Sequence, residues 1–254
     1  MADVVASGTA RSSRRTWVPL VVQPAAILVV LAAFAVWLNT ASLTPTEANT
    51  LNPGDILALT GQHLLLTLAS TVIVLLIGIP LGVALTRGPF RRASTAILAV
   101  ANFGQAAPAV GLVVLLAAWL GFNFWAAVVA LVLYAILPVL RNTIIGIESV
   151  DQRLVEAGRG MGMSAGAVLF RVELPLAVPV MLAGIRTALV LLVGSAALAT
   201  FIGAGGLGLL ITTGVNLFLP KVLVSGALLI ALLALSIDWL GRVVETVARP
   251  KGLR

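Results

Sequence analysis

The chain alternates between long apolar stretches and short polar connections. Six stretches are long and apolar enough to cross a membrane, because a spanning helix needs about twenty such residues. They are Val21–Leu38, Leu64–Leu85, Ala96–Leu120, Phe122–Leu140, Val178–Ile202 and Val222–Leu240. Apolar residues run continuously through each stretch, which predicts helices rather than the alternating strands of a membrane barrel. The expected fold class is all-α: a polytopic membrane protein with six transmembrane helices, the third and fourth joined in a tight hairpin at Gly121.

The composition supports this class. Of the 254 residues, 60% are hydrophobic and only 10% are charged, and the mean hydropathy is +1.13. A soluble domain usually carries about a quarter charged residues, so this chain lacks the polar groups to cover a surface in water. It has no cysteine, which excludes disulfides, thiolate zinc sites and a cysteine nucleophile.

The basic residues indicate how the helices are oriented. With six spans, fourteen of the sixteen Lys and Arg residues fall on one side of the membrane; Lys221 lies on the other side and Arg186 inside the fifth span. This is the positive-inside bias of membrane proteins, and it predicts both termini in the cytoplasm. The bias accounts for the net charge of +7 without a nucleic-acid partner. The arginine pair in Ser13–Val18 loosely matches an export signal, but the length of the apolar run after it favours an uncleaved first helix.

One polar segment interrupts the apolar pattern between the fourth and fifth spans. It reads EAGRGMGMSAGAVLFRVELP, from Glu156 to Pro175. Its periodicity predicts two short amphipathic helices around a tight turn at Gly162. Ser149 or Asp151 is expected to cap the first helix and Ser164 the second, with Pro175 ending the second helix or opening the next span. The apolar face of the first helix is expected to comprise Val150, Leu154, Ala157, Gly158 and Met161.

The spacing of this segment resembles the EAA loop of ABC importer permeases. Glu156-Ala157-Gly158 is followed by three residues, Gly162, nine residues and then Val172-Glu173-Leu174-Pro175. The family pattern has Ala where this chain has Gly158. The resemblance covers roughly 63–242, and three stretches within it are similar to the branch that imports quaternary-amine osmoprotectants. These stretches are His63–Val83, Gly104–Leu116 and Gly184–Ile211.

The resemblance implies a type I ABC importer permease fold with three parts. Residues 1–60 would hold an N-terminal tail, the first helix and an outer segment; residues 61–245 would form the five-helix permease core with a cytoplasmic coupling loop at 142–177; residues 246–254 would be a cytoplasmic tail. The residues implied to contact the ATPase through this loop are Glu156, Ala157, Gly158, Gly162, Leu174 and Pro175.

The resemblance also implies the function and the partners. The chain would form half of the translocation pathway for an osmoprotectant such as glycine betaine, carnitine or choline, in the plasma membrane of a bacterium. It would pair with a second copy or a homologous permease, with ABC ATPase subunits and with an extracytoplasmic binding protein. The sequence contains no G-x-x-x-x-G-K-[ST] motif, so we expect no ATP hydrolysis by this chain; ATP and Mg would be held by the partner ATPase, and we expect no bound cofactor or metal here.

Several polar or glycine positions within the apolar stretches are candidates for the translocation path or a gate. They are Gln105, Pro108, Arg186, Gly203, Gly205 and Gly206. Each also has a structural interpretation: helix packing for Gln105, Pro108 and the glycines, and an interfacial position for Arg186. The segment Gly203–Pro220 is too short and broken to span and predicts a half-helix. His63, the only histidine, is expected to cap or anchor the outer end of its helix.

Two alternative functions remain open at this stage. The first is a permease of the same architecture for another small solute. The second is a self-sufficient channel or secondary transporter, which would need carboxylates near the middle of the membrane; the one candidate, Asp238, lies near the end of the last span, four residues before Arg242. The exact substrate, the composition of the pore and the role of the first helix are not predicted by the sequence.

Overall fold

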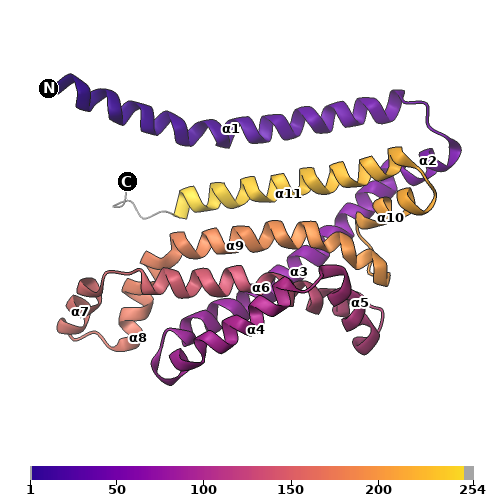
Figure 1. Cartoon of the computed structure of the whole chain (residues 1–254). Coiled ribbons are helices and arrows are strands. Elements are labelled where there is room, and N and C mark those ends of the chain that lie inside the picture. The colour runs from indigo at the N-terminus through magenta and orange to yellow at the C-terminus, as the bar shows by residue number, and fades with distance from the viewer. Residues whose placement is uncertain (1, 249–254) are drawn as a thin grey trace.

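The computed structural model describes the backbone of residues 2–248 and, except for Pro89, the side chains of residues 20–248. Every element in this range is helical, and the helices run side by side in an elongated bundle (Figure 1). In chain order the elements are α1 (Ala2–Thr40), α2 (Pro45–Thr50), α3 (Pro53–Leu85), the 3-10 helix η1 (Gly88–Ala93), α4 (Ser94–Ala106), α5 (Ala109–Leu120), α6 (Phe124–Glu148), α7 (Gln152–Gly160), α8 (Ala165–Val168), the π-helical turn η2 (Leu169–Glu173), α9 (Leu174–Ala196), the 3-10 helix η3 (Ala197–Ile202), α10 (Gly208–Asn216) and α11 (Pro220–Ala248).

Within the described residues, five helical segments are long and apolar enough to cross a membrane, or six if the bent pair α4–α5 counts as one span. The five are Leu20–Thr40, Pro53–Leu85, Phe124–Glu148, Ala165–Ile202 and Pro220–Ala248. The all-α, multi-pass prediction is therefore confirmed. The helices extend beyond the predicted stretches because helical hydrogen bonding continues past the apolar residues. The tail predicted at 246–254 begins inside α11, and its residues 249–254 lie outside the described range.

The third predicted span is not one straight helix. It breaks between α4 and α5, whose axes differ by 100°. Pro108 has no N–H to continue the helical hydrogen bonds, and Ala107 before it adopts an extended conformation (φ −61°, ψ 144°). The prediction of a single helix over 96–120 was therefore wrong at this point. The tight connection after it is confirmed, because Gly121, with a φ of +87°, turns the chain directly from α5 into α6.

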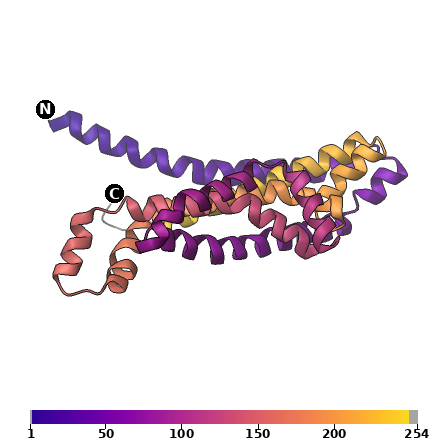
Figure 2. The ribbon, with the colours of Figure 1, turned by 60° about the horizontal axis from the view of Figure 1, so that its bottom comes forward.

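Helix α6 forms the centre of the bundle. It packs against both α3 and α9 (Figure 2), and its buried residues outnumber those of any other described helix. Small residues allow this close approach. A Cβ at Gly184 of α9 would lie 2.5 Å from the Cβ of Asn142, and a Cβ at Gly82 of α3 would lie 2.7 Å from the Cβ of Thr143. The α3–α6–α9 contact is the main core of the molecule.

Helix α1 lies outside this core and packs mainly on α11. Figure 1 shows it running along α11 and diverging toward its N-terminal end. Two side chains connect the helices: Trp239 Nε1 donates to the carbonyl of Leu20 at 2.8 Å, and Gln23 Nε2 donates to the carbonyl of Leu235 at 3.0 Å. The first helix is thus an addition to the core rather than a part of it.

The two ends of the bundle differ in charge. At one end of the bundle α3 and α6 finish and α7 begins (Figure 1). It is called here the basic end because its connections and the last two turns of α6 and α11 contain these arginines: Arg87, Arg91, Arg92, Arg141, Arg153, Arg159, Arg171 and Arg242. The opposite end carries α2 and α10. There Thr44 and Glu47 form a reciprocal capping box on α2, and Lys221 of α11 lies 3.5 Å from the carboxylate of Glu47.

Candidate functional site

The polar segment between α6 and α9 extends from the basic end of the bundle (Figure 2). It is called here the α7–α8 segment and comprises residues 149–175. Asp151 caps α7 by accepting from the N–H of Arg153 at 2.9 Å, and Ser164 caps α8 by accepting from the N–H of Ala167 at 3.2 Å. Ser149 instead ends α6. Of the two predicted caps for the first helix, Asp151 is confirmed and Ser149 is wrong.

The second helix of this segment is not a separate element. α8 continues through the π-helical turn η2 directly into α9, without a break in helical structure. Pro175 is the second residue of α9 and lies inside this continuous helix, where it has no N–H to donate to the preceding turn. The expectation of a distinct second short helix, ended by Pro175 or followed by a span that Pro175 opens, was therefore wrong, because the helical segment runs from Ala165 to Ile202.

A tight turn joins the two helices, as predicted. Gly162 has a φ of +82°, a conformation that residues with a Cβ rarely adopt. Its N–H donates to the carbonyl of Arg159 at 2.9 Å, and the next N–H, of Met163, donates to the carbonyl of Gly158 at 3.1 Å. A Cβ at Gly162 would meet no atom within 4 Å. The turn is therefore fixed in shape and open on its outer side.

One face of α7 packs inward against α8. Val155 and Gly158 are buried, and Val155 forms a small apolar cluster with Val150 and Val168. A Cβ at Gly158 would lie 3.4 Å from Val168 and 3.5 Å from the sulfur of Met163, an ordinary contact distance. The site therefore has room for alanine. The predicted apolar face was only partly correct, since Val155 is buried while Leu154, Ala157 and Met161 are exposed.

The other face of α7 is available to a partner. Glu156 is exposed and makes no hydrogen bond or ion pair with the side chains that the structure describes. The same segment also has exposed apolar side chains, among them Leu154, Met161 and, on η2, Phe170, the last two being 76% and 70% exposed. A short helix with an unpaired carboxylate, small residues and exposed apolar side chains fits a groove in another protein.

The base of the α7–α8 segment holds a partly buried ion pair that the sequence analysis missed. Glu173 is 5% exposed and contacts the guanidinium of Arg87 through both carboxylate oxygens. Leu174 beside it and Val83 of α3 both pack against an apolar cluster that includes Ala177. A glutamate in the mostly apolar run before Pro175 was the available signal, because buried carboxylates need a partner, but the sequence does not say which of many arginines pairs with it.

Two of the candidate path residues lie at the break in the third stretch. Gln105 is half-buried in the last turn of α4, and Pro108 is exposed at the N-cap position of α5. Within the described residues the side-chain amide of Gln105 forms no hydrogen bond. An unpaired amide at a bent helix can interact with a polar solute or with another chain.

Arg186 is held by two carboxylates of α11. Its Nη1 donates to Glu245 at 3.0 Å and its Nε lies 3.5 Å from Asp238. Asp238 also accepts from Arg242 at 2.9 Å, which confirms the predicted ion pair four residues apart, and from Gln23 of α1 at 3.4 Å. Among the described residues, this network joins Arg186 and Arg242 to Asp238 and Glu245. In this structure the ion pairs of Arg186 therefore connect α9 to α11.

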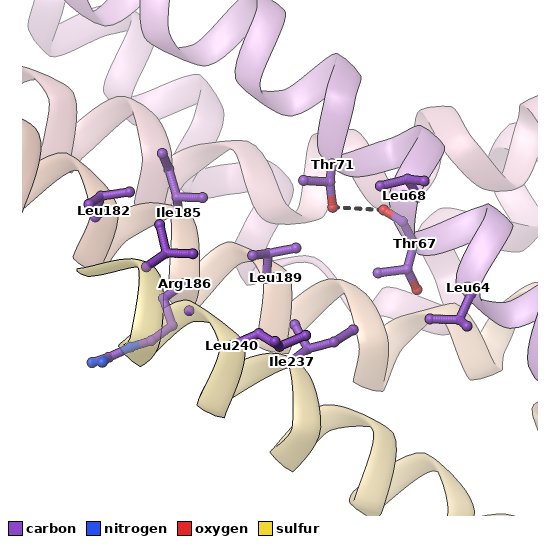
Figure 3. Close-up of a pocket in the computed structure, with 12 residues that line it drawn as sticks. Leu64, Thr67, Leu68, Thr71, Leu182, Ile185, Arg186, Leu189, Ile237 and Leu240 are labelled. Atoms are coloured by element: carbon purple, nitrogen blue, oxygen red, sulfur yellow. Dashed lines mark hydrogen bonds between the residues drawn. The ribbon is translucent and has the colours of Figure 1, made fainter. Parts of the chain in front are cut away.

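A pocket of about 430 Å³ lies beside Arg186, between α3, α9 and α11. Figure 3 shows the guanidinium turned toward α11 at one end of the pocket, with leucine and isoleucine side chains and two threonines along the rest. The hydroxyls of Thr67 and Thr71 donate to backbone carbonyls of their own helix. The pocket therefore presents an apolar lining and does not offer groups for a zwitterion.

Two of the three candidate glycines, Gly205 and Gly206, pack against α3 at the opposite end. All three, Gly203, Gly205 and Gly206, have positive φ values. The N–H of Gly206 donates to Gln62 Oε1 at 3.0 Å, and a Cβ at Gly205 would collide with the same oxygen. The half-helix predicted after these glycines is confirmed as α10. Close packing is the role that the structure assigns to Gly205 and Gly206.

His63 also belongs to this contact. It is fully buried inside α3, and its Nε2 lies 2.8 Å from the carbonyl of Val193 in α9. The expectation that it caps a helix end was wrong, because α3 begins ten residues earlier, at Pro53. The candidate path residues do not form one cluster. Arg186 and Gly203 are separated by seventeen residues of helix, or about 25 Å at 1.5 Å per residue.

The geometry of the chain matches known membrane proteins. A family model described as "Binding-protein-dependent transport system inner membrane component" matches residues 78–249. The glycine betaine/carnitine/choline transport system permease protein OpuCB of Bacillus subtilis is 41% identical over 203 residues, covering 80% of this chain and 93% of that protein. The osmoprotectant import permease protein OsmW of Salmonella typhimurium is 41% identical over 211 residues, covering 80% of this chain and 96% of that protein. A chain of the MetNI methionine ABC transporter in an inward-facing conformation shares the fold, with a TM-score of 0.66 at 24% identity over 77% of this chain and 96% of that one.

Proposed function

Because this chain belongs to the family of binding-protein-dependent transport system inner membrane components, we propose that it forms half of the translocation pathway of an ATP-driven osmoprotectant importer. The imported solute is a quaternary amine such as glycine betaine, carnitine or choline. Relatives that are named for these solutes and that align over four-fifths of this chain support this substrate class.

The observation that carries the proposal is the exposed face of the α7–α8 segment. Glu156 and Ala157 lie on an exposed helix face, next to exposed apolar side chains and an open turn at Gly162. An ABC ATPase subunit binds this face, and closure of two ATPase subunits on ATP moves the segment. Leu174 and Pro175, the first two residues of α9, transmit that movement into the rest of that helix. ATP and Mg are held by the ATPase, and this chain contributes no catalytic residue.

The remaining partners follow from the same arrangement. A second permease, either another copy of this chain or a homologue, completes the pathway, and an extracytoplasmic binding protein delivers the solute at the end that carries α2 and α10. The basic end faces the cytoplasm of a bacterium, with both termini on that side, since basic connections favour the cytoplasmic side. We infer that Gln105 and Pro108 contribute to the path where α4 and α5 bend, and that Gly203, Gly205 and Gly206 shape its outer end.

Arg186 is a weaker candidate for contact with the solute. A cation repels a quaternary ammonium group, and its attraction to the carboxylate of betaine or carnitine is already met by Asp238 and Glu245. Aromatic cages usually hold quaternary ammonium ions. The described side chains show only two aromatic pairs, Phe34–Trp37 and Phe124–Trp125. Selection of the solute is therefore assigned mainly to the binding protein.

The alternative functions make different demands. An importer of the same architecture for another solute would share every feature described above and is distinguished by uptake alone. A self-sufficient transporter or channel would need a free carboxylate within the membrane. Asp238 instead lies in an ion-pair network with Arg186 and Arg242 near the basic end of α11.

The experiment that tests this proposal is a mild-detergent purification of the tagged chain from its native membrane, with mass-spectrometric identification of the proteins that co-purify. The expected result is an ABC ATPase together with either this chain alone as permease or a second permease, which would also define the pore. Purification of this chain without an ATPase, under conditions in which a known importer complex survives, would contradict the proposal and favour the self-sufficient transporter.

A further inference from the structure

The α7–α8 segment is connected to α3 by an ion pair whose carboxylate is buried. Arg87 follows the last turn of α3, and Glu173 is the last residue of the turn η2. Nη1 of Arg87 donates to Oε1 of Glu173 at 3.2 Å, and Nη2 contacts Oε2. A two-point contact between a planar guanidinium and a carboxylate fixes their relative orientation as well as their distance.

This contact joins elements that the chain itself does not join. The α7–α8 segment is covalently connected to α6 before it and to α9 after it, whereas α3 lies more than sixty residues away in the sequence. Beside the ion pair, Leu174 and Val83 of α3 both pack against one apolar cluster, formed by Ile147, Ala177 and Met181. Apolar contacts allow side chains to slide, because they have no preferred direction. The ion pair, in contrast, fixes the orientation of the two elements relative to each other.

The ion pair also lies at a weak point of the helix. η2 is a single π-helical turn, a rare arrangement in which hydrogen bonds join residues five apart. A force on α7 and α8 would bend the chain first at this turn. The displacement of α7 and α8 would then not be transmitted to the helix bundle. A link from the end of the turn to α3 opposes such bending.

Burial makes the pair sensitive to loss of either partner. The side chain of Glu173 is only 6% exposed; that of Arg87 is 36% exposed, but its Nε is buried without a hydrogen-bond partner. Removing the guanidinium would leave a buried carboxylate without its counter-charge, which proteins tolerate poorly. The two residues are therefore expected to act as one unit.

We propose that Arg87 and Glu173 are positioning residues that make α3 move together with the α7–α8 segment when the ATPase displaces it, an inference that rests on the proposed function. The pair converts a local movement at the ATPase into a movement of the α3–α6–α9 core. Without the ion pair, ATP is still hydrolysed, but less of each displacement of the α7–α8 segment reaches the translocation pathway.

A second ion pair in the same connection provides a matched control. Arg91 lies four residues after Arg87, and its Nη2 is 4.0 Å from Oε1 of Glu148 at the end of α6. The two side chains are 73% and 48% exposed. Exposed pairs of this kind contribute little because water and salt screen them. Loss of Arg91 removes the same charge from the same connection without breaking a buried contact.

The test uses the whole importer, reconstituted in lipid vesicles with its ATPase and binding protein, and measures uptake per ATP hydrolysed for whichever of glycine betaine, carnitine and choline the wild type accumulates best. The wild type is measured first, since absence of ATP-dependent uptake of all three solutes there would refute the proposed function itself. With Arg87→Gln we expect uptake per ATP to fall at least tenfold while the ATPase still co-purifies; with Arg91→Gln we expect it to stay within twofold of wild type. An unchanged ratio in Arg87→Gln, a parallel loss of uptake and hydrolysis, or loss of the ATPase from the complex would each overturn the inference.

A covalent replacement of the ion pair separates positioning from folding. The chain has no cysteine, so Arg87→Cys and Glu173→Cys can be combined and joined by a short thiol-specific, disulfide-forming cross-linker, using cysteine-free partner subunits. We expect the double variant to have a low uptake per ATP, to regain several-fold on cross-linking and to lose that gain when a reductant cleaves the link. Complete cross-linking with no gain in the ratio would show that the tie between the two positions does not transmit the movement.

Discussion

At the scale of single residues, Gly162 combines a fixed backbone conformation with an open surface. Its φ of +82° disfavours any residue with a Cβ, and asparagine is among the residues that tolerate this region best. A side chain here would project away from α7 and α8, because no atom lies within 4 Å of a Cβ at this position. A substitution at Gly162 therefore combines two effects, strain in the turn and obstruction of a partner, which a control must separate.

Gly88 provides that control. It also has a positive φ, of +41°, and open space around a Cβ, but it lies in the connection after α3. We expect Gly162→Asn to lower recovery of the ATPase in the purified complex at least tenfold and Gly88→Asn to leave it unchanged. The amount of chain recovered in the membrane reports folding and should be equal for both. Equal recovery of the ATPase in the two variants would show that the Gly162 turn is not part of the docking face.

Glu47 makes a pH-dependent contribution at the opposite end of the bundle. The backbone N–H of Thr44, at 2.8 Å, and the ammonium of Lys221 hold the pKa of this carboxyl below its usual value of 4.5. A group whose pKa is lower in the folded state stabilises the fold above its unfolded pKa and loses that effect as the pH falls through the folded pKa.

Replacing Glu47 should therefore matter only while the carboxyl is charged. We expect Glu47→Gln to lower the thermal unfolding temperature of the detergent-purified chain at pH 7, and we expect the difference from wild type to shrink as the pH falls below 4.5. The measurement is a pair of melting curves at each pH. A difference that stays constant across this range would mean that the charge of Glu47 does not contribute.

At the scale of elements, the contact between α6 and α9 depends on Gly184. A Cβ there would lie 2.5 Å from the Cβ of Asn142 and 2.6 Å from the carbonyl oxygen of Pro138, so the two helices would have to separate. Overpacking of this kind costs about 1–3 kcal/mol. We expect Gly184→Ala to lower the unfolding temperature of the purified chain.

Gly194 on the same helix is the matched position. A Cβ at Gly194 would meet no atom within 4 Å, and alanine favours a helix over glycine by about 1 kcal/mol. We expect Gly194→Ala to leave the unfolding temperature unchanged or to raise it. If Gly184→Ala and Gly194→Ala shift it equally, helix propensity rather than close packing at Gly184 governs the effect.

The elements also show how far the sequence predicts this structure. Continuous apolar stretches predict the spanning helices, because each helix satisfies its backbone internally in lipid. The tight turn at Gly162 and the caps at Asp151 and Ser164 follow from local chemistry and were predicted. The break at Pro108 was not predicted, because the size of a bend at a proline depends on what α5 packs against, namely α6 and η3.

Contacts between distant elements were the part that the sequence did not predict. Glu173 pairs with Arg87, 86 residues away, and Arg186 with Glu245, 59 residues away. The sequence contains several acidic residues that could pair with each arginine. Spacing along the chain does not predict which of them lies next to it on another helix. The location of His63 was mispredicted for a similar reason, since α3 continues well beyond the apolar stretch that defined it.

At the scale of the whole molecule, the structure divides into a core, an added helix and two distinct ends. The core of α3, α6 and α9 connects directly to the α7–α8 segment at the basic end. α1 is attached to α11, and through Gln23 and Asp238 it reaches the network that holds Arg186 of α9. A permease subunit requires such an arrangement, in which one end receives force and the rest moves as packed helices.

The central claim is that this chain is the permease of an ATP-driven osmoprotectant importer. The most direct test is uptake of radiolabelled glycine betaine, carnitine and choline by lipid vesicles that contain the chain with its ATPase, with ATP inside or outside and with or without the binding protein. The account predicts accumulation of at least one of these solutes only when ATP is on the ATPase side and the binding protein is on the other. Accumulation by vesicles that contain this chain alone, or no ATP-dependent accumulation of any of the three by a fully assembled complex, would contradict it.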